Sequence, residues 1–140
     1  MLRFTAFTSN HYQAASKLWA QTAALATTLG DSEKEITRYL MRNPGCSFVC
    51  LNEHGDLLGT VLGGHDGRRG FLYHLAVREE HRHLGIAKKL ISLSLDQLRN
   101  IGIERCMLMV KTENDTAQQF WKKQGWEFRD DLKMFSLNLA

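Results

Sequence analysis

The pattern of apolar and polar residues predicts a helical first third and then alternating strands and helices. A short first strand is expected over residues 2–7, followed by a helix capped by Ser9 or Asn10. The apolar residues at helical spacing in this helix are Tyr12, Ala15, Trp19 and Ala23. Ser32 and Glu35 have the spacing of a capping box and predict a second helix, which Asn43-Pro44-Gly45 would end.

From residue 47 onward the spacing of the apolar positions is that of strands. Two apolar runs, residues 47–51 and 57–63, flank a turn around Gly55 and predict a hairpin. Residues 71–77 are almost continuously apolar, which is typical of a central strand covered on both faces. The middle of the chain is therefore expected to build a sheet.

A strand, a helix and a further strand follow one another in the next part of the chain. The helix opens at Gly85 and ends near Gly102, and the strand after it covers residues 106–110. Such a unit forms a right-handed crossover, so the strands before and after the helix should lie parallel.

The last part of the chain predicts one more helix and two closing strands. Asn114 or Asp115 caps the helix, and the strands cover residues 126–128 and 134–139. The expected fold is a single α/β domain over residues 1–140. It has a mixed, mostly antiparallel sheet of six to seven strands, a central parallel pair and helices on both faces.

Composition narrows the classes of partner and compartment. The net charge is only +3 and is spread along the chain, so no nucleic-acid partner is expected. The start lacks a secretory signal and no stretch approaches a membrane-spanning length, which predicts a cytoplasmic protein without a membrane partner. Three cysteines without a CxxC pair, and the poor ligand spacing of His81 and His83, argue against disulfides and a metal site.

The loop between the strand ending at Val77 and the helix opening at Gly85 carries the most informative chemistry. It delivers backbone N–H groups to a helix N-terminus, an arrangement that binds phosphate. Gly85 and Ala87 are small enough for a pyrophosphate to approach, and Arg82 and Lys88 add positive charge. The loop lacks the residues of a Walker loop and the three glycines of a Rossmann fingerprint, so nucleotide hydrolysis and hydride transfer lose support.

The run Arg82-His83-Leu84-Gly85-Ile86-Ala87 resembles the signature of the GNAT N-acetyltransferase superfamily, which is Gln or Arg, two residues, Gly, one residue, then Gly or Ala. Leu75-Ala76-Val77 resembles the strand before that signature. Residues 114–126 look like the family's Asn-x-x-Ala...Phe-Tyr-x-x-x-Gly-Phe segment. The resemblance covers the chain best from about residue 57 onward.

The resemblance implies acetyl-CoA as co-substrate, with its pantetheine arm along residues 75–77 and its pyrophosphate on the loop. A backbone N–H near Ala76 or Val77 would stabilise the oxyanion. The cofactor-binding residues implied are Leu75, Ala76, Val77, Arg82, His83, Leu84, Gly85, Ile86, Ala87, Lys88 and Asn114.

The proton-transfer groups depart from the family pattern. Trp121 stands where the family usually has its general-acid tyrosine, and Met109 stands where ribosomal-protein N-terminal acetyltransferases have a glutamate. Tyr73 is expected on the strand face toward the acceptor and is the candidate catalytic residue, although an ordinary half-buried strand tyrosine has the same pattern. His74 is the better base chemically, but it should point away unless a bulge shifts the register.

The predicted function is transfer of an acetyl group from acetyl-CoA to a primary amine of a small molecule, an amino acid or a peptide. A non-catalytic acyl-CoA-binding or sensor domain is the alternative, because the usual acid is absent at Trp121. A nucleotide-binding domain that uses the same helix N-terminus is a second rival. Whether two copies form a homodimer stays open.

Overall fold

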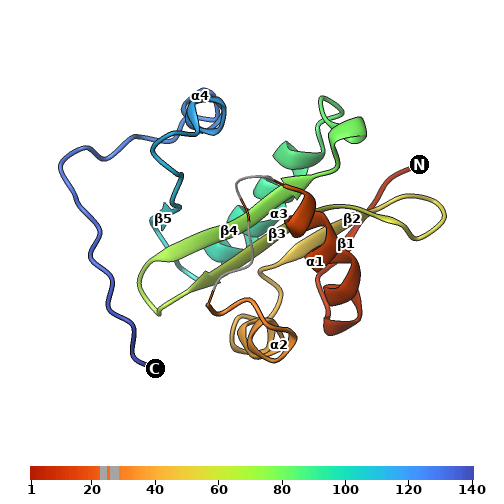
Figure 1. Ribbon diagram of the computed structural model, residues 1–140, viewed down its shortest axis with the longest axis horizontal. Coiled ribbons are helices and arrows are strands. Elements are labelled where there is room, and N and C mark those ends of the chain that lie inside the picture. The colour runs from red at the N-terminus through yellow and green to blue at the C-terminus, as the bar shows by residue number, and fades with distance from the viewer. Residues whose placement is uncertain (23–24, 26–28) are drawn as a thin grey trace. The chain divides into compact units, whose positions relative to one another are not determined.

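Figure 1 shows the computed structural model of the chain, which describes residues 1–22, 25 and 29–140. Two compact units are present, Met1–Met109 and Val110–Ala140. The single domain expected over residues 1–140 stays a prediction. Among the described residues, no helix combines the length and apolarity needed to cross a membrane.

The first unit is built on one mixed sheet, in which the strands follow the order β1-β2-β3-β4-β5. The strands are β1 (Arg3–Ala6), β2 (Phe48–Leu51), β3 (Leu57–His65), β4 (Gly70–Val77) and β5 (Cys106–Met107). Neighbouring strands are antiparallel except for β4 and β5, which are parallel. The predicted hairpin and the predicted parallel pair are therefore confirmed.

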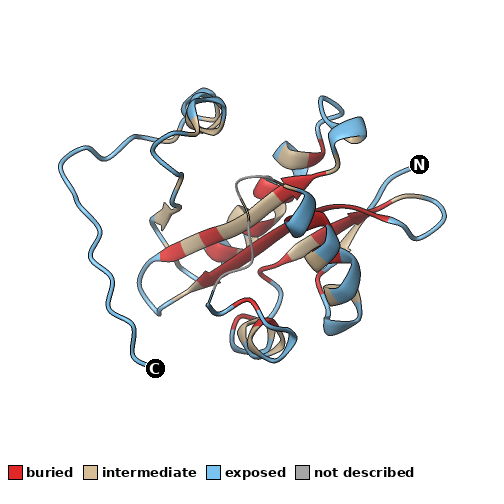
Figure 2. Ribbon diagram, in the orientation of Figure 1, coloured by how far each residue is buried: buried red, intermediate tan, exposed pale blue. Residues whose placement is uncertain are grey.

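Helices cover both faces of this sheet. The core on one face joins β-strand residues to α1 (Tyr12–Gln21) and α2 (Glu33–Arg42), and Trp19 at its centre is 0% exposed. On the other face α3 (Ile86–Asn100) contacts β2, β3 and β4. Because both faces are covered, β3 is buried along nearly its whole length, as Figure 2 shows.

The two N-terminal helices begin at local capping signals. A short 3-10 turn, Ser9–His11, is capped by Thr8 and leads into α1, whose own N-cap is His11. The prediction of Ser9 or Asn10 as the cap of this helix is therefore wrong by one or two residues. Ser32 caps α2. Its hydroxyl accepts a hydrogen bond from the backbone N–H of Glu35, and the Glu35 carboxylate accepts one from the backbone N–H of Ser32. Ala23, predicted on the first helix, lies outside the described residues.

The second unit contains one helix, α4 (Asp115–Lys123). Asn114 caps it by accepting a 3.0 Å hydrogen bond from the backbone N–H of Ala117, and Gly125 follows its end with φ +92°. The cap is therefore the first of the two predicted residues, Asn114.

The expected sheet of six to seven strands is wrong in its count, because the described residues form five strands. Residues 126–128 and 134–139 are not strands, and the strand expected over 106–110 is limited to Cys106–Met107. The apolar pattern of residues 134–139 is suited to a strand, but a strand also needs a hydrogen-bonded partner, and neither segment has one within its unit.

Candidate functional site

The loop after β4 turns the chain sharply into the N-terminus of α3. The backbone N–H of Arg78 donates a 2.8 Å hydrogen bond to Leu58 in β3, and a 3-10 turn, Glu79–His81, follows. His83 and Gly85 then have left-handed φ values of +67° and +82°. Gly85 is the N-cap of α3, which begins at Ile86.

This geometry leaves a set of backbone donors at the loop. The first backbone N–H groups of a helix have no acceptor within the helix. In α3 the bond from Lys89 N–H to the Gly85 carbonyl, at 3.1 Å, marks the first turn. Apart from Gly85 itself, its two neighbours in the chain and nearby helix backbone, no atom lies within 4 Å of the position that a Cβ on Gly85 would take. The N-terminus of α3 therefore presents N–H groups and the positive end of its dipole to open space.

The side chains of the predicted cofactor loop divide into two groups. Arg82, His83, Leu84, Gly85 and Lys88 are exposed, and Ala87 is half-buried. Ile86, in contrast, is 2% exposed, so only its backbone could contact a bound molecule. Arg82 is held near the strand end, because its Nε donates a 3.2 Å hydrogen bond to the carbonyl of Val77.

The neighbouring edge of β4 is open where the strand approaches the loop. Pairing with β5 covers only Gly70 and Phe71, whereas β4 continues to Val77. Within the described sheet, Leu75, Ala76 and Val77 therefore have no strand partner on the β5 side. An extended polar chain could pair with this edge as an added strand does.

A hollow of about 400 Å³ lies beside the same strand end, between it and the C-terminal part of α1. Its lining residues are Leu18, Gln21, Thr22, Val77, Arg78, Glu79, Glu80 and Arg82. The hollow is lined mainly by polar groups and contains charges of both signs, so it differs from the N–H cluster at α3.

A β-bulge in the middle of β4 changes the direction of one residue. Thr60 pairs with Ala76 and Leu62 pairs with Tyr73, so one residue of β3 faces two of β4. His74 lies in this bulge with φ +50°. Its ring contacts Trp19, with centroids 4.6 Å apart, which places His74 on the α1 and α2 face. The β-bulge that the sequence required for His74 to point toward this face is therefore present.

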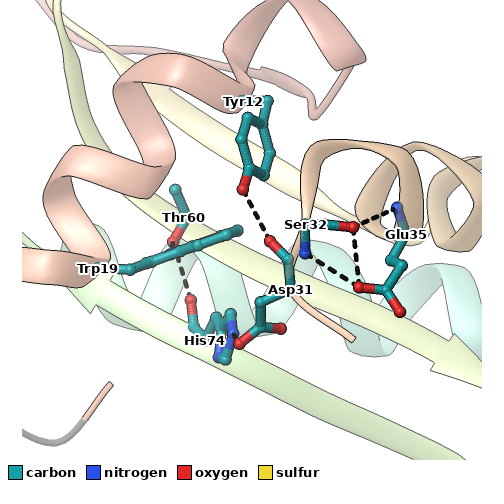
Figure 3. Close-up of polar contacts among 7 residues, drawn as sticks. All are labelled: Tyr12, Trp19, Asp31, Ser32, Glu35, Thr60 and His74. Carbon is teal, nitrogen blue, oxygen red and sulfur yellow. Dashed lines mark hydrogen bonds and ion pairs between the residues drawn. The ribbon is translucent and has the colours of Figure 1, made fainter. Parts of the chain in front are cut away.

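The imidazole of His74 faces a carboxylate, as Figure 3 shows. Its Nε2 lies 3.1 Å from Oδ2 of Asp31, and their side chains are 15% and 11% exposed. The sequence pattern did not single out Asp31. Its position directly before the Ser32 cap is the local signal that it is held in place, but its pairing with His74 depends on the tertiary fold.

Tyr73 lies on the same face and packs among aromatic rings. It stacks on Phe71 with centroids 6.0 Å apart, and it meets Tyr39 edge-on at 6.4 Å. Burial raises the pKa of the Tyr73 hydroxyl above its ordinary value of 10.0. The phenol is therefore protonated near neutral pH and can donate a hydrogen bond. Its catalytic role stays a prediction.

Two positions of interest belong to the second unit. Asn114 caps α4, and Trp121 contacts the rings of Phe120 and Trp126 at 5.2 and 5.1 Å. The cofactor contact predicted for Asn114 stays a prediction. Among the described residues, no group of three His, Cys, Asp or Glu is arranged to hold a metal ion.

Comparison with known proteins identifies the family. The sequence profile of the acetyltransferase (GNAT) family matches residues 12–126. An acetyltransferase of Sodalis glossinidius (strain morsitans) is 30% identical over 133 residues, which cover 95% of this chain and 92% of that protein.

Solved structures show the same fold. The PaiA N-acetyltransferase of Thermoplasma acidophilum in complex with coenzyme A has a TM-score of 0.78 at 17% identity, covering 93% of this chain and 92% of that one. AAC(6')-Iy in complex with a bisubstrate analogue, CoA-S-monomethyl-acetylneamine, also has a TM-score of 0.78 at 17% identity, with 99% of each chain covered. The chain described here therefore belongs to the acetyltransferase (GNAT) family and is an acyl-CoA-dependent N-acetyltransferase.

Proposed function

We propose that this protein transfers an acetyl group from acetyl-CoA to a primary amine, by direct attack of the amine within a ternary complex. The observation that carries the proposal is the N-terminus of α3, where backbone donors face open space at Gly85 beside the unpaired edge of β4. Family membership supplies the reaction class, and the loop supplies the place where an anionic cofactor fits.

The residues present suit coenzyme A. The first-turn N–H groups of α3, together with the charges of Arg82 and Lys88, would hold the pyrophosphate. The open backbone edge of Leu75, Ala76 and Val77 would pair with the amides of the pantetheine arm. Bound there, acetyl-CoA supplies the acetyl group as a thioester, and a backbone N–H near Ala76 or Val77 would stabilise the developing oxyanion.

The acceptor side is formed by the face on which α1 and α2 lie. Tyr73 is on this face and would hydrogen-bond the acceptor or relay a proton with its protonated hydroxyl. A bisubstrate analogue built on neamine occupies the neighbour AAC(6')-Iy, which makes amino sugars one class to test here. Amino acids and peptide N-termini are the other classes. We further propose that the protein works in the cytoplasm. No nucleic-acid partner is expected, since the net charge of +3 is dispersed along the chain.

The alternative is a non-catalytic acyl-CoA sensor. It is favoured by one observation: Trp121, packed between Phe120 and Trp126, has no ionisable group at the position of the usual general acid. A thiolate of coenzyme A leaves acceptably without an acid, so catalysis does not require that group.

Thiol release from acetyl-CoA separates the two functions. The amines to be tested are the aminoglycoside sisomicin, a linear polyamine, free amino acids and an alanyl peptide. Release that depends on one of these amines, with the acetylated product seen by mass spectrometry, is the expected result. Binding of coenzyme A with no release on any amine would support the sensor.

A further inference from the structure

Two linked hydrogen bonds hold one backbone carbonyl in the bulge of β4. The hydroxyl of Thr60 in β3 donates a 2.8 Å hydrogen bond to the carbonyl oxygen of His74, as Figure 3 shows. The same hydroxyl accepts a 2.9 Å bond from Nε1 of Trp19 in α1. Because its hydrogen and a lone pair are both engaged, the direction of the hydroxyl is fixed. Thr60 and Trp19 are both 0% exposed, so water does not compete for either bond.

The carbonyl of His74 belongs to the same peptide group as the N–H of Leu75. No cis peptide bond occurs in the described part of the chain, and in a planar trans peptide the C=O and the N–H point in opposite directions. Since the carbonyl points to Thr60 in β3, the Leu75 N–H points away from β3. On that side β5 pairs with β4 only at Gly70 and Phe71. The Leu75 N–H therefore points to the open edge of β4.

The regular part of β4 after the bulge gives the same direction independently. The N–H of Arg78 donates a 2.8 Å hydrogen bond to the carbonyl of Leu58 in β3. The N–H groups of successive residues in a strand point to alternate sides, so that of Ala76 also points to β3. Those of Leu75 and Val77 point to the open edge. A molecule bound along this edge can thus reach Leu75 and Val77, but not the N–H of Ala76.

The peptide at the bulge depends on a side chain for its orientation. His74 has φ +50°, and the pairing of β4 with β3 shifts register at this point. A left-handed residue other than glycine is strained, and it persists where its surroundings hold it. Hydrogen bonds of the ladder hold the regular parts of the strand, whereas the carbonyl of His74 is held by the Thr60 hydroxyl. This hydroxyl therefore takes the place of a ladder bond.

We propose that Thr60, itself held by Trp19, is a positioning residue for acetyl transfer, because it orients the N–H of Leu75 toward the oxygen of the thioester carbonyl. This rests on the proposed function, which places the acyl group at the open edge of β4. As the amine nitrogen bonds to the carbonyl carbon, the carbonyl π electrons move to the oxygen, which accepts a hydrogen bond from Leu75. The C=O double bond then re-forms, the carbon–sulfur bond breaks, and the nitrogen gives one proton to water.

A positioning role of this kind affects the rate and leaves cofactor binding unchanged. The negative charge on the carbonyl oxygen develops only as the amine attacks, so an oriented donor stabilises the transition state more than the bound substrate. Coenzyme A has no acyl carbonyl, so its binding should not depend on the orientation of the Leu75 N–H. Thr60 should therefore influence kcat and not the Kd of coenzyme A.

The first experiment compares Thr60→Val and Thr60→Ser with the wild type, using the best acceptor among the amines tested. Thr60→Val keeps the shape and removes both hydrogen bonds, whereas Thr60→Ser keeps the hydroxyl. We expect kcat to fall about 10–10²-fold in Thr60→Val, less than the about 10²–10³-fold that loss of a complete oxyanion donor costs. The Kd of coenzyme A, measured by calorimetry, should stay unchanged, and Thr60→Ser should recover most of the rate.

Ser94→Ala is the matched control for loss of a buried hydroxyl. Ser94 in α3 is also 0% exposed, and its hydroxyl donates a 2.6 Å hydrogen bond to the carbonyl of Cys46. Its substitution removes a comparable hydrogen bond that does not involve β4. At a temperature at which all variants are folded, Ser94→Ala should keep the kcat of the wild type. A loss of kcat in Ser94→Ala equal to that in Thr60→Val would overturn the specific role of Thr60.

A second measurement uses the wild type alone and so decides the matter even if Thr60→Val does not fold. A ketone analogue of acetyl-CoA, with a methylene group in place of the sulfur, carries the carbonyl but cannot transfer the acetyl group. In nitrogen-15 NMR, the amide signal of Leu75 should differ between the complexes with this analogue and with coenzyme A. The amide of Ala76, which points to β3, should differ much less.

The outcomes separate this inference from the proposed function. An active wild type whose folded Thr60→Val variant keeps the full kcat would overturn the inference alone, as would a Leu75 amide signal that is the same in both complexes. A wild type that releases no thiol with any amine would overturn the proposed function and this inference with it.

Discussion

The hydroxyl of Thr60 donates a 2.8 Å hydrogen bond to the backbone carbonyl of His74, across the bulge between β3 and β4. A bulge leaves backbone groups outside the ladder, and a buried carbonyl without a donor is costly. Thr60 is 0% exposed and supplies that donor from the side chain. It also accepts from Trp19, so one hydroxyl links α1, β3 and β4 on the side of the sheet that α1 covers.

Replacing Thr60 with valine tests this link. The substitution keeps the shape and leaves the Trp19 Nε1–H and the His74 carbonyl without their partner, which should lower the free energy of unfolding by roughly 2–6 kcal/mol. Urea denaturation measures the change. The matched control is Thr5→Val in β1, at a threonine with no side-chain hydrogen bond among the described residues, and its effect should be much smaller. Equal effects of the two substitutions would contradict the role of Thr60.

Removing the cap of α2 should affect both stability and the site. Ser32→Ala removes the acceptor for the Glu35 N–H and should cost about 1 kcal/mol of unfolding free energy. Because Asp31 directly precedes the cap, the His74–Asp31 pair should also loosen, which should change the NMR signals of the His74 imidazole. Ser16→Ala, at a half-buried serine of α1 whose hydroxyl donates to the Gln13 carbonyl, is the control. A stability loss with unchanged imidazole signals would show that the cap does not position Asp31.

The buried cysteine thiols should make the free energy of unfolding decrease at alkaline pH. Burial raises the pKa of the Cys106 thiol from its ordinary value of 9.0 to about 11, and it also raises the pKa of Cys46 and of Cys50. Unfolded thiols lose protons near pH 9, whereas the folded ones keep theirs. The folded state therefore has its full stability below about pH 9 and loses it as the pH rises toward 11.

Two measurements check this expectation. The urea midpoint, followed with a reducing agent present, should fall between about pH 9 and about pH 11, and less so in Cys106→Ala. Iodoacetamide at about pH 8 should label the three thiols slowly in the native protein and completely in denaturant. Rapid labelling of the native protein would show that the thiols are not protected.

Much of the fold was predictable because its signals are local. The Ser32 capping box, the turn at Gly55 and the glycine before α3 each depend on a few adjacent residues, and each lies where the pattern placed it. The prediction of two closing strands was wrong, because an apolar pattern does not show whether the segment has a partner strand to pair with.

The part of the site formed by adjacent residues was predictable from sequence, and the part formed by tertiary packing was not. The position of Gly85 before a helix N-terminus follows from sequence, since the loop and its helix are contiguous. The direction of His74 does not, because the bulge depends on the pairing of β4 with β3 and on Thr60. Asp31 could not be linked to His74 from sequence, because only the packing of the segment before α2 against β4 brings them together.

The most direct test of the acyl-CoA site is calorimetric titration of coenzyme A into Gly85→Glu and Gly55→Glu. Both glycines have φ +82° and open surroundings, so the two glutamates impose the same backbone strain. Only Gly85 lies at the N-terminus of α3, where a carboxylate would occupy the space for pyrophosphate. We predict wild-type affinity in Gly55→Glu and no measurable binding in Gly85→Glu. Equal affinity in the two variants, or binding of ATP or NAD as tight as that of coenzyme A, would contradict the assignment.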